Sequence, residues 1–534
     1  MLPPARRRLE WFCICPRLLP IALCLLGGCA SSAATRVPLE SGVVQGVSRG
    51  GVGVYRGIPF AAPPVGNLRW RPPQPVQPWQ APRPATAFGP ICEQVGDPWP
   101  PGAPSESMSE DCLYLNVWTP DHRTAPLPVM VWIYGGSWTN GSGSTPLYWG
   151  DALARRGVVV VTFNYRVGAL GFLAHPDLVR ESATEAVGNY GLLDQIAALQ
   201  WVHANIAAFG GDPSRVTIFG QSAGSMSANL LTVSPPARGL FHRVIGQSGA
   251  VFIPPEIAPA GNEFLRAGAL AQGERYAKAA GAASIAELRK LPVANLLAAQ
   301  HGFGFHFILD GEVVPAQPHA AYSAGHQADV PMLLGYNAGD GLSFLSGATI
   351  TAASFSADIE KAFGKLPPPL LAQYPATTDQ EARISRGNLE RDLRFGYDMW
   401  TWFRLQATAG HAPVFAYLFD HAPPYPRSSA AASWGAGHGM EMRYVFDHLD
   451  QDPWAWSAVD RQLSETMVGY WTNFAKTGDP NGGGLPPWPA YRRGSERVQV
   501  LSEHIHADAV PNLGALQIFD AVFASVRPPV ASHD

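Results

Sequence analysis

The sequence is poor in charged residues of either sign. Of its 534 residues, 38 are Lys or Arg and 42 are Asp or Glu, so charged residues make up 15% and the formal net charge is −4. No cluster of Lys and Arg occurs after the first residues, which argues against a nucleic-acid-binding protein. Hydrophobic residues make up 46%, enough for a large buried core.

No linker, internal repeat or low-complexity tract divides the chain. Length alone would favour about three or four domains, but no boundary in composition supports such a division. We therefore predict one α/β domain over residues 38–525, followed by a C-terminal tail, 526–534. The 50 prolines and 55 glycines indicate many long ordered loops, which usually carry the specificity of a site.

Cysteine is also scarce, with six in the whole chain. Only Cys92 and Cys112 fall within the predicted domain, and neither has a His or Cys neighbour at the spacing of metal ligands. We therefore expect no metal site. In an exported protein, two cysteines separated by a short loop predict a disulfide.

The first residues have the pattern of an export signal. Basic residues precede a short apolar run, Leu18 to Leu26, and Leu26-Gly27-Gly28-Cys29 follows. This end resembles the lipobox of bacterial lipoproteins, which implies a signal over 1–28, cleavage before Cys29, a lipid on that cysteine and a short tether over 29–37. The alternative is an ordinary signal cut after Ala30 or Ala34.

Either form of processing takes the mature protein out of the cytoplasm. The apolar run is too short to span a membrane once processed, so any membrane contact would be through a lipid on Cys29 alone. The expected locations are an outer-membrane or periplasmic lipoprotein, or a secreted protein. The sequence gives no indication of an oligomeric state.

A nucleophile elbow is predicted at Gly220-Gln221-Ser222-Ala223-Gly224. A β-branched and aromatic run, 216–219, enters this pentapeptide and a helix-permissive segment leaves it. The glycines make room for a very tight turn that exposes the hydroxyl of Ser222 at a sheet edge. A G-x-S-x-G string alone is weak evidence, because both residue types are common.

Two nearly continuous apolar runs, 128–134 and 157–165, predict strands buried on both faces, and hence a parallel sheet with helices on each side. The segments 42–46 and 53–60 predict an antiparallel hairpin at the sheet edge. The loop 135–138 follows the first run, and its small residues would let backbone N–H groups bind a developing oxyanion. A structural turn is the alternative interpretation of this loop.

Several motifs together resemble the type-B carboxylesterases of the cholinesterase/carboxylesterase family. They occur in the order of the family and span residues from about 38 to about 520. The matching segments are 60–66, 110–116, 131–136, 164–166, 188–195, the elbow, and 471–478. The resemblance implies an α/β-hydrolase fold: a large, mostly parallel central sheet with helices on both faces and helical and loop insertions over the active site.

The resemblance also implies a serine hydrolase that uses no cofactor, acts on small-molecule esters, and has its catalytic residues in the order Ser, acid, His. The acid is Asp340, where the family usually has Glu, and Asp310 is the rival in what resembles a structural turn. The base is His438, whose flanks fit the His-Gly-x-Glu motif of the family, while His448 lacks this context.

The remaining expectations follow from the same alignment of motifs. The oxyanion donors would be the amides of Gly136, Ser137 and Ala223. The candidate pocket residues are Trp138, Gln221, Phe303, Phe305, Phe344 and Glu441. Glu110 and Arg166 are expected to form a buried salt bridge.

Two departures from the cholinesterase pattern argue against a choline ester substrate. Gln221 stands where cholinesterases have glutamate, and Trp99 lies farther from Cys112 than their choline-binding tryptophan does. A general carboxylesterase is therefore predicted, with a specialised esterase for feruloyl, polyester or toxin side-chain esters as the alternative. A cholinesterase-like binding module is a third possibility, disfavoured because Ser222, Asp340 and His438 are all present.

Overall fold

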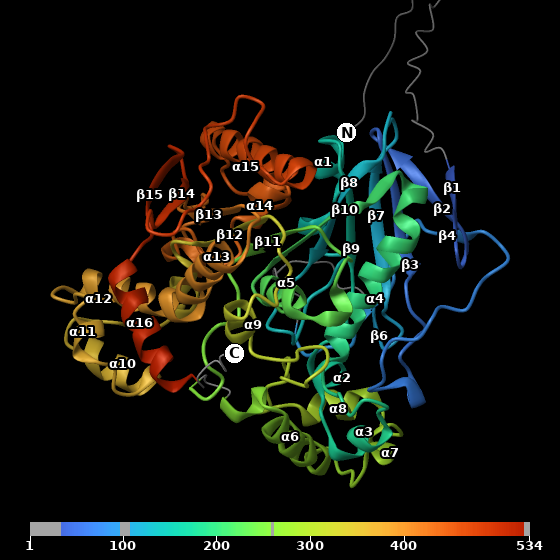
Figure 1. Ribbon diagram of the computed structural model, residues 1–534, viewed down its shortest axis with the longest axis horizontal. Helices are drawn as coiled ribbons and strands as arrows, with labels where there is room; N and C mark the ends of the chain where they lie inside the picture. Colours follow the sequence, from blue (N-terminus) through green and yellow to red (C-terminus); the bar gives the residue numbers. More distant parts are fainter. Residues whose placement is uncertain (1–33, 97–106, 258–260, 528–534) are drawn as a thin grey trace, which may run out of the picture.

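The computed structural model describes residues 34–96, 107–257 and 261–527. The expected signal, Cys29, Trp99 and most of the expected tail lie outside these ranges. The described chain is organised around a 13-stranded mixed sheet (Figure 1). Its strands, in spatial order, are β1 (Ala34–Leu39), β2 (Gly42–Arg49), β3 (Val52–Pro59), β7 (Tyr114–Pro120), β9 (Val159–Phe163), β8 (Leu127–Ile133), β10 (Gly211–Gln221), β11 (Arg243–Gln247), β12 (Met332–Asn337), β13 (Val414–Phe419), β14 (Arg497–Leu501) and β15 (His506–Ala509), with β4 (Arg83–Pro84) paired to β2.

The strands from β9 through β14 pair in parallel, and the strands on either side pair antiparallel except for the short β4, which pairs with β2 in parallel. Every residue of β9, β12 and β13 is buried, and β8 is buried except for its first residue. Strands covered on both faces read as continuous apolar runs, which is why the sequence revealed them. The fold is the predicted α/β class with a mostly parallel central sheet.

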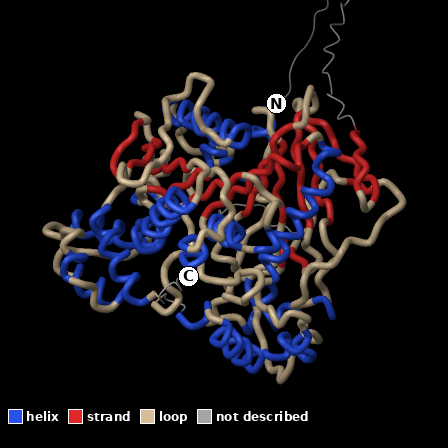
Figure 2. Tube along the Cα trace, viewed as in Figure 1, coloured by secondary structure: helices blue, strands red, loops and turns tan. Residues whose placement is uncertain are grey.

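The helices cover both faces of this sheet (Figure 2). In Figure 1, α15 (Ala458–Thr477) lies on one side, and α4 (Tyr190–Asn205), α5 (Ala223–Val233) and α13 (Tyr397–Ala409) lie on the other. Within the described ranges, no helix is both long enough and apolar enough to cross a membrane.

The hairpin predicted at 42–46 and 53–60 is formed by β2 and β3. It lies one strand in from the sheet edge, because residues 34–39 form β1, which pairs with residues 42–47 of β2. Residues 34–37 are therefore part of the sheet, although the sequence placed them in a tether. Pairing with β2 satisfies backbone groups that a free tether would leave to water.

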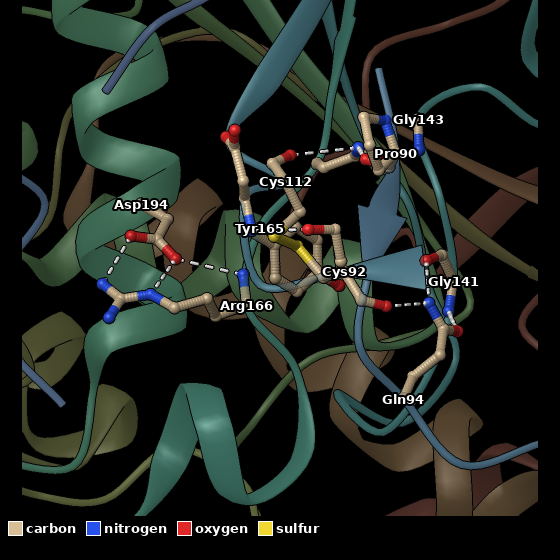
Figure 3. Close-up of a disulfide and its surroundings, with 12 residues drawn as sticks. Pro90, Cys92, Gln94, Cys112, Gly141, Gly143, Tyr165, Arg166 and Asp194 are labelled. Carbon is tan, nitrogen blue, oxygen red and sulfur yellow. Dashed lines mark hydrogen bonds and ion pairs between the residues drawn. A yellow bond between two sulfur atoms is a disulfide. The ribbon is translucent and has the colours of Figure 1, made fainter. Parts of the chain in front are cut away.

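The disulfide between Cys92 and Cys112 is present, as predicted (Figure 3). The expected salt bridge between Glu110 and Arg166 is wrong. The guanidinium of Arg69 binds both carboxylate oxygens of Glu110 at 2.5 Å.

Arg166 instead pairs with Asp194 of α4 through two side-chain hydrogen bonds of 2.8 and 2.7 Å (Figure 3). Asp194 also accepts a hydrogen bond from the backbone N–H of Arg166 at 3.0 Å. Three N–H donors of Arg166 therefore satisfy the fully buried carboxylate of Asp194. This explains why Arg166 pairs with Asp194 and not with Glu110.

A second buried carboxylate lies where α13 meets the loop after β11. Asp398 accepts a hydrogen bond from the backbone N–H of Phe252 at 3.0 Å. Burial raises the pKa of Asp398 from its usual value near 3.8 to about 8. The folded protein therefore holds a proton on Asp398 at pH values where the unfolded chain has released it.

This proton contributes to the pH dependence of the free energy of unfolding. The contribution of Asp398 should be absent in Asp398→Asn. Because the folded pKa is raised, the wild-type protein loses stability as pH rises from about 4 to about 8. Between pH 5 and pH 8 we expect its free energy of unfolding in urea to fall by roughly 2–4 kcal/mol relative to that of D398N. The exposed Asp508→Asn serves as the control, and a parallel pH dependence of D398N and wild type would contradict the assignment.

Candidate functional site

The turn between β10 and α5 places Ser222 at the carboxyl edge of the parallel strands. Ser222 has φ 56° and ψ −127°, a backbone conformation that residues other than glycine rarely adopt. The flanking glycines allow this turn for steric reasons. A Cβ on Gly224 would lie 2.0 Å from the carbonyl oxygen of Ile133, and a Cβ on Gly220 would lie 2.5 Å from the carbonyl of Gly224.

The loop after β8 runs directly past Ser222. A Cβ on Gly135 would lie 2.9 Å from the Cβ of Ser222, so only glycine allows this approach. The next residues, Gly136, Ser137 and Trp138, all have positive φ, at 106°, 55° and 57°. In the described part of the chain, the N–H groups of Gly136 and Ser137 donate to no other atom.

The amide of Ala223 completes this arrangement from the opposite side. Ala223 is the first residue of α5, so its N–H has no partner within the helix. The three predicted oxyanion donors therefore belong to two segments, the loop after β8 and the start of α5, that lie beside Ser222. Backbone amides at a helix N-terminus and in a tight turn are suited to stabilise a negative charge.

The structure brings Asp340 and His438 together although they are 98 residues apart. Nδ1 of His438 lies 2.7 Å from Oδ1 of Asp340. Asp340 is fully buried, and its other oxygen accepts hydrogen bonds from the hydroxyl of Ser248 at 2.9 Å and from the backbone N–H of Asn337 at 2.8 Å. The carboxylate is thus fixed in the orientation in which it holds the Nδ1 side of the imidazole.

The two rival residues lie in other surroundings. Asp310 accepts hydrogen bonds from the backbone N–H groups of Glu312 and Val314, so it stabilises its own turn. His448 bonds to the carbonyl oxygen of Leu147 and lies 3.3 Å from Asp151. Neither residue occupies the position that the sequence assigned to Asp340 or His438.

The Nε2 side of His438 faces the elbow. Nε2 lies 3.1 Å from the side-chain nitrogen of Gln221, the residue before Ser222, and the same nitrogen lies 3.5 Å from Nδ1, so this amide rests against the imidazole ring. No hydrogen bond joins the hydroxyl of Ser222 to the imidazole in the described chain, so the contact on this side is to the neighbouring amide. Such contacts are often long or misaligned in ligand-free enzymes and form only when substrate is bound.

Glu441 lies behind the pair in a network of amides. Its carboxylate accepts hydrogen bonds from Gln247 at 3.0 Å and from Asn337 at 2.5 Å. Each amide is also bound to a further group: Trp471 donates to Gln247, and Asn337 donates to the carbonyl oxygen of Gly437. Burial, followed by the nearby charge of Asp340, raises the pKa of Glu441.

This network connects both halves of the site. The carbonyl oxygen of Gln247 accepts the backbone N–H of Ser222 at 2.8 Å, while the backbone N–H of Asn337 binds Asp340. Glu441 is therefore linked through Gln247 to the nucleophile elbow and through Asn337 to Asp340. Its position supports the expected role near the site without direct contact with a reacting atom.

Two phenylalanines pack on the imidazole of His438. Phe395 stacks on the ring with centroids 4.5 Å apart and planes 20° apart, and Phe344 lies at 5.4 Å. Phe344 was predicted, but Phe395 was missed because a single aromatic residue in a helical segment carries no signal in the sequence. It belongs to a π-helical turn, Asp392–Gly396, of a kind that is frequent at functional sites.

The other predicted pocket aromatics divide into two groups. Trp138 is buried beside the elbow, where its indole N–H donates to the hydroxyl of Ser227 at 2.9 Å. Phe303 and Phe305 instead pack on Tyr276 of α6 (Arg266–Ala279), so the structure assigns them to the packing of this helix. From the same segment, Phe307 is the ring that meets Trp138, at 5.5 Å.

A metal ion has no candidate site in the chain that the structure describes. No three or more His, Cys, Asp or Glu side chains gather there as ligands. The groups that meet at the elbow are the hydroxyl of Ser222, the His438–Asp340 pair and the backbone amides around them.

Comparisons with known proteins identify the relatives of this chain. A model described as "Carboxylesterase family" matches residues 33–515. The fumonisin B1 esterase of Sphingopyxis macrogoltabida is 38% identical over 478 residues, which cover 87% of this chain and 86% of that protein. The para-nitrobenzyl esterase of Bacillus subtilis (strain 168) is 36% identical over 499 residues, or 89% and 96% of the two chains.

Solved structures are similar as well. A structure of PNB esterase superposes with a TM-score of 0.77 and 34% identity, covering 91% of this chain and 99% of the other.

The amide network predicts that Glu441→Gln is destabilising although the side chains have the same shape. A glutamine can accept only one of the two amide N–H groups, and both amides are fixed by other partners, so one buried donor stays unpaired. We expect the free energy of unfolding in urea to fall by roughly 1–3 kcal/mol. The exposed Glu465→Gln should change it by less than about 0.5 kcal/mol, and equal effects of the two would refute the role of the network.

Proposed function

Because this chain belongs to the carboxylesterase family and is a carboxylic-ester hydrolase, we propose that it cleaves esters through an acyl-enzyme on Ser222. The observation that supports this most directly is the 2.7 Å contact between His438 and Asp340 beside the elbow. A serine hydroxyl is a weak nucleophile until a base removes its proton, and a histidine is an effective base when a carboxylate fixes its tautomer.

In the first half-reaction, Oγ of Ser222 attacks the ester carbonyl carbon while Nε2 of His438 takes the hydroxyl proton. The carbonyl oxygen gains a negative charge, which the amides of Gly136, Ser137 and Ala223 stabilise. The bond to the alcohol oxygen then breaks, and His438 returns the proton to that oxygen. Water deacylates Ser222 by the same route and releases the acid.

Gln221 takes part in this scheme through the position of the imidazole. Its side-chain nitrogen lies 3.1 Å from Nε2 and 3.5 Å from Nδ1 of His438, so the amide rests against the imidazole ring. His438 must exchange this neighbour for the hydroxyl of Ser222 before proton transfer.

The substrate is proposed to be a small-molecule carboxylic ester bound against Trp138, Phe344 and Gln221. Gln221 is neutral, and so it provides no attraction for a cationic choline group. A specialised esterase remains the second candidate, and it is favoured by the similarity to a protein named for its action on fumonisin B1. This similarity supports toxin side-chain esters over the feruloyl and polyester alternatives.

We further propose that residues 1–28 direct export and that Cys29 becomes the lipidated N-terminus of an outer-membrane or periplasmic lipoprotein. The support is the order of basic residues, apolar run and Leu-Gly-Gly-Cys in the sequence. The Cys92–Cys112 disulfide is consistent with an oxidising compartment. A freely secreted form is the alternative.

A fluorophosphonate probe should label the protein with one equivalent on Ser222 and should not label Ser222→Ala. Asp340→Asn should lower kcat for a simple ester by about 10³–10⁴-fold, because the wrong tautomer of His438 then faces the serine. Asp310→Asn and His448→Gln are matched controls, since these rival residues lie elsewhere. A loss of activity in a folded H448Q with an active H438Q would contradict the assignment.

Processing can be tested in a bacterial host by mass spectrometry of the intact N-terminus. We expect a diacylglyceryl-modified Cys29 in the membrane fraction, and Cys29→Ala should prevent both the modification and membrane association. A soluble protein that begins at Ser31 or Thr35 would instead establish an ordinary secretory signal.

A further inference from the structure

Phe344 is an apolar side chain left exposed beside the proposed base. It is 46% exposed, while its ring lies 5.4 Å from that of His438. Most large apolar side chains in the described chain are buried, and an exposed one at a reactive centre is a surface that a bound molecule can cover. Phe344 follows Asp340 by four residues, on the short helical turn Asp340–Leu345.

A positive charge lies on the same surface. The guanidinium of Arg394 stands over the ring of Phe344, 4.8 Å from its centroid. Arg394 and Phe395 are consecutive residues of the π-helical turn, and Phe395 stacks on His438. Arg394 is thus attached to an element that is already in contact with the imidazole.

Arg394 is held in place but is not fully paired. Its Nε donates to Glu390 at 2.9 Å, and its side chain remains 47% exposed. Glu390 is only 6% exposed and also binds Arg386, which in turn binds Asp358. Among the described residues, the two terminal nitrogens of Arg394 have no hydrogen-bond partner, so its forked end is open to a ligand.

The charges on the other side of the site do not oppose an anion. Gln221, which contacts the Nε2 side of His438, is neutral. Asp340 and Glu441 are fully buried and satisfied by hydrogen bonds, so neither presents an open carboxylate. A guanidinium with an open fork over an aromatic ring is suited to bind a carboxylate that is attached to a short apolar chain.

We propose that Arg394 and Phe344 form a specificity subsite for esters that carry a carboxylate a few atoms from the ester bond. The apolar part of such a substrate packs on Phe344, and its carboxylate binds the terminal nitrogens of Arg394. Substrates of this class are half-esters of dicarboxylic or polycarboxylic acids, or esters of hydroxy acids. The inference rests on the proposed function and names the substrate class of the same site.

The test compares two matched pairs of esters that differ only in charge. Monobenzyl glutarate and its primary amide place the group in the acyl part, and the benzoyl ester of 4-hydroxybutyrate and its primary amide place it in the alcohol part. We expect the wild-type protein to have a higher kcat/KM for the anionic member of at least one pair. Arg394→Gln should lower that value by about tenfold, mainly through KM, and change the value for the amide by less than about twofold.

Two further variants sharpen the result. Arg394→Lys keeps the charge without the fork and should give an intermediate value. Arg461→Gln removes an exposed arginine of α15 that is paired with Asp450, and should leave the rates for both pairs of esters unchanged. Hydrolysis of the amide member by R394Q shows at the same time that the variant is folded.

The possible outcomes separate this inference from the function on which it rests. Hydrolysis of all four esters without a preference for the anion, or a preference that R394Q retains, would overturn the subsite and leave the esterase intact. An absence of hydrolysis of every ester by the wild-type protein would overturn the proposed catalytic function itself.

Discussion

The site depends on one backbone contact between two loops that are far apart in the sequence. Gly339, the residue before Asp340, forms a β-bridge with Gly437, the residue before His438. The N–H of Gly339 donates to the carbonyl oxygen of Ala436 at 2.9 Å. A Cβ on Gly339 would lie 2.1 Å from the carbonyl oxygen of Trp434, so no other residue permits this approach. The paired backbones thereby fix the distance between Asp340 and His438, so their side chains can form the hydrogen bond with little rearrangement.

The fold and the position of the elbow could be predicted because their signals are local. Continuous apolar runs indicate strands buried on both faces, and the glycines around Ser222 are required by the turn itself. The family resemblance then indicated where Asp340 and His438 should be sought, and the fold that it implied is confirmed. The catalytic roles of these residues stay predictions, although the geometry favours them.

What the sequence could not provide is the choice of tertiary partners. The motifs indicated Glu110 as the partner of Arg166, but α4 places Asp194 where three N–H groups of Arg166 meet its carboxylate. Phe395 stacks on His438 from a π-helical turn, an irregularity that the sequence pattern does not indicate. Phe303, Phe305 and Phe307 alternate along one segment, and only the packing of α6 decides which ring turns toward Trp138.

The backbone of Ser222 has a consequence for the history of such proteins. Its φ of 56° and ψ of −127° suit glycine, so a glycine there would relax the turn and raise thermal stability. Once a gene copy no longer needs the hydroxyl, drift toward glycine at this position is favoured by folding alone. A serine in this conformation costs folding free energy that a glycine would not, and the reactivity that we propose for its hydroxyl is what offsets that cost.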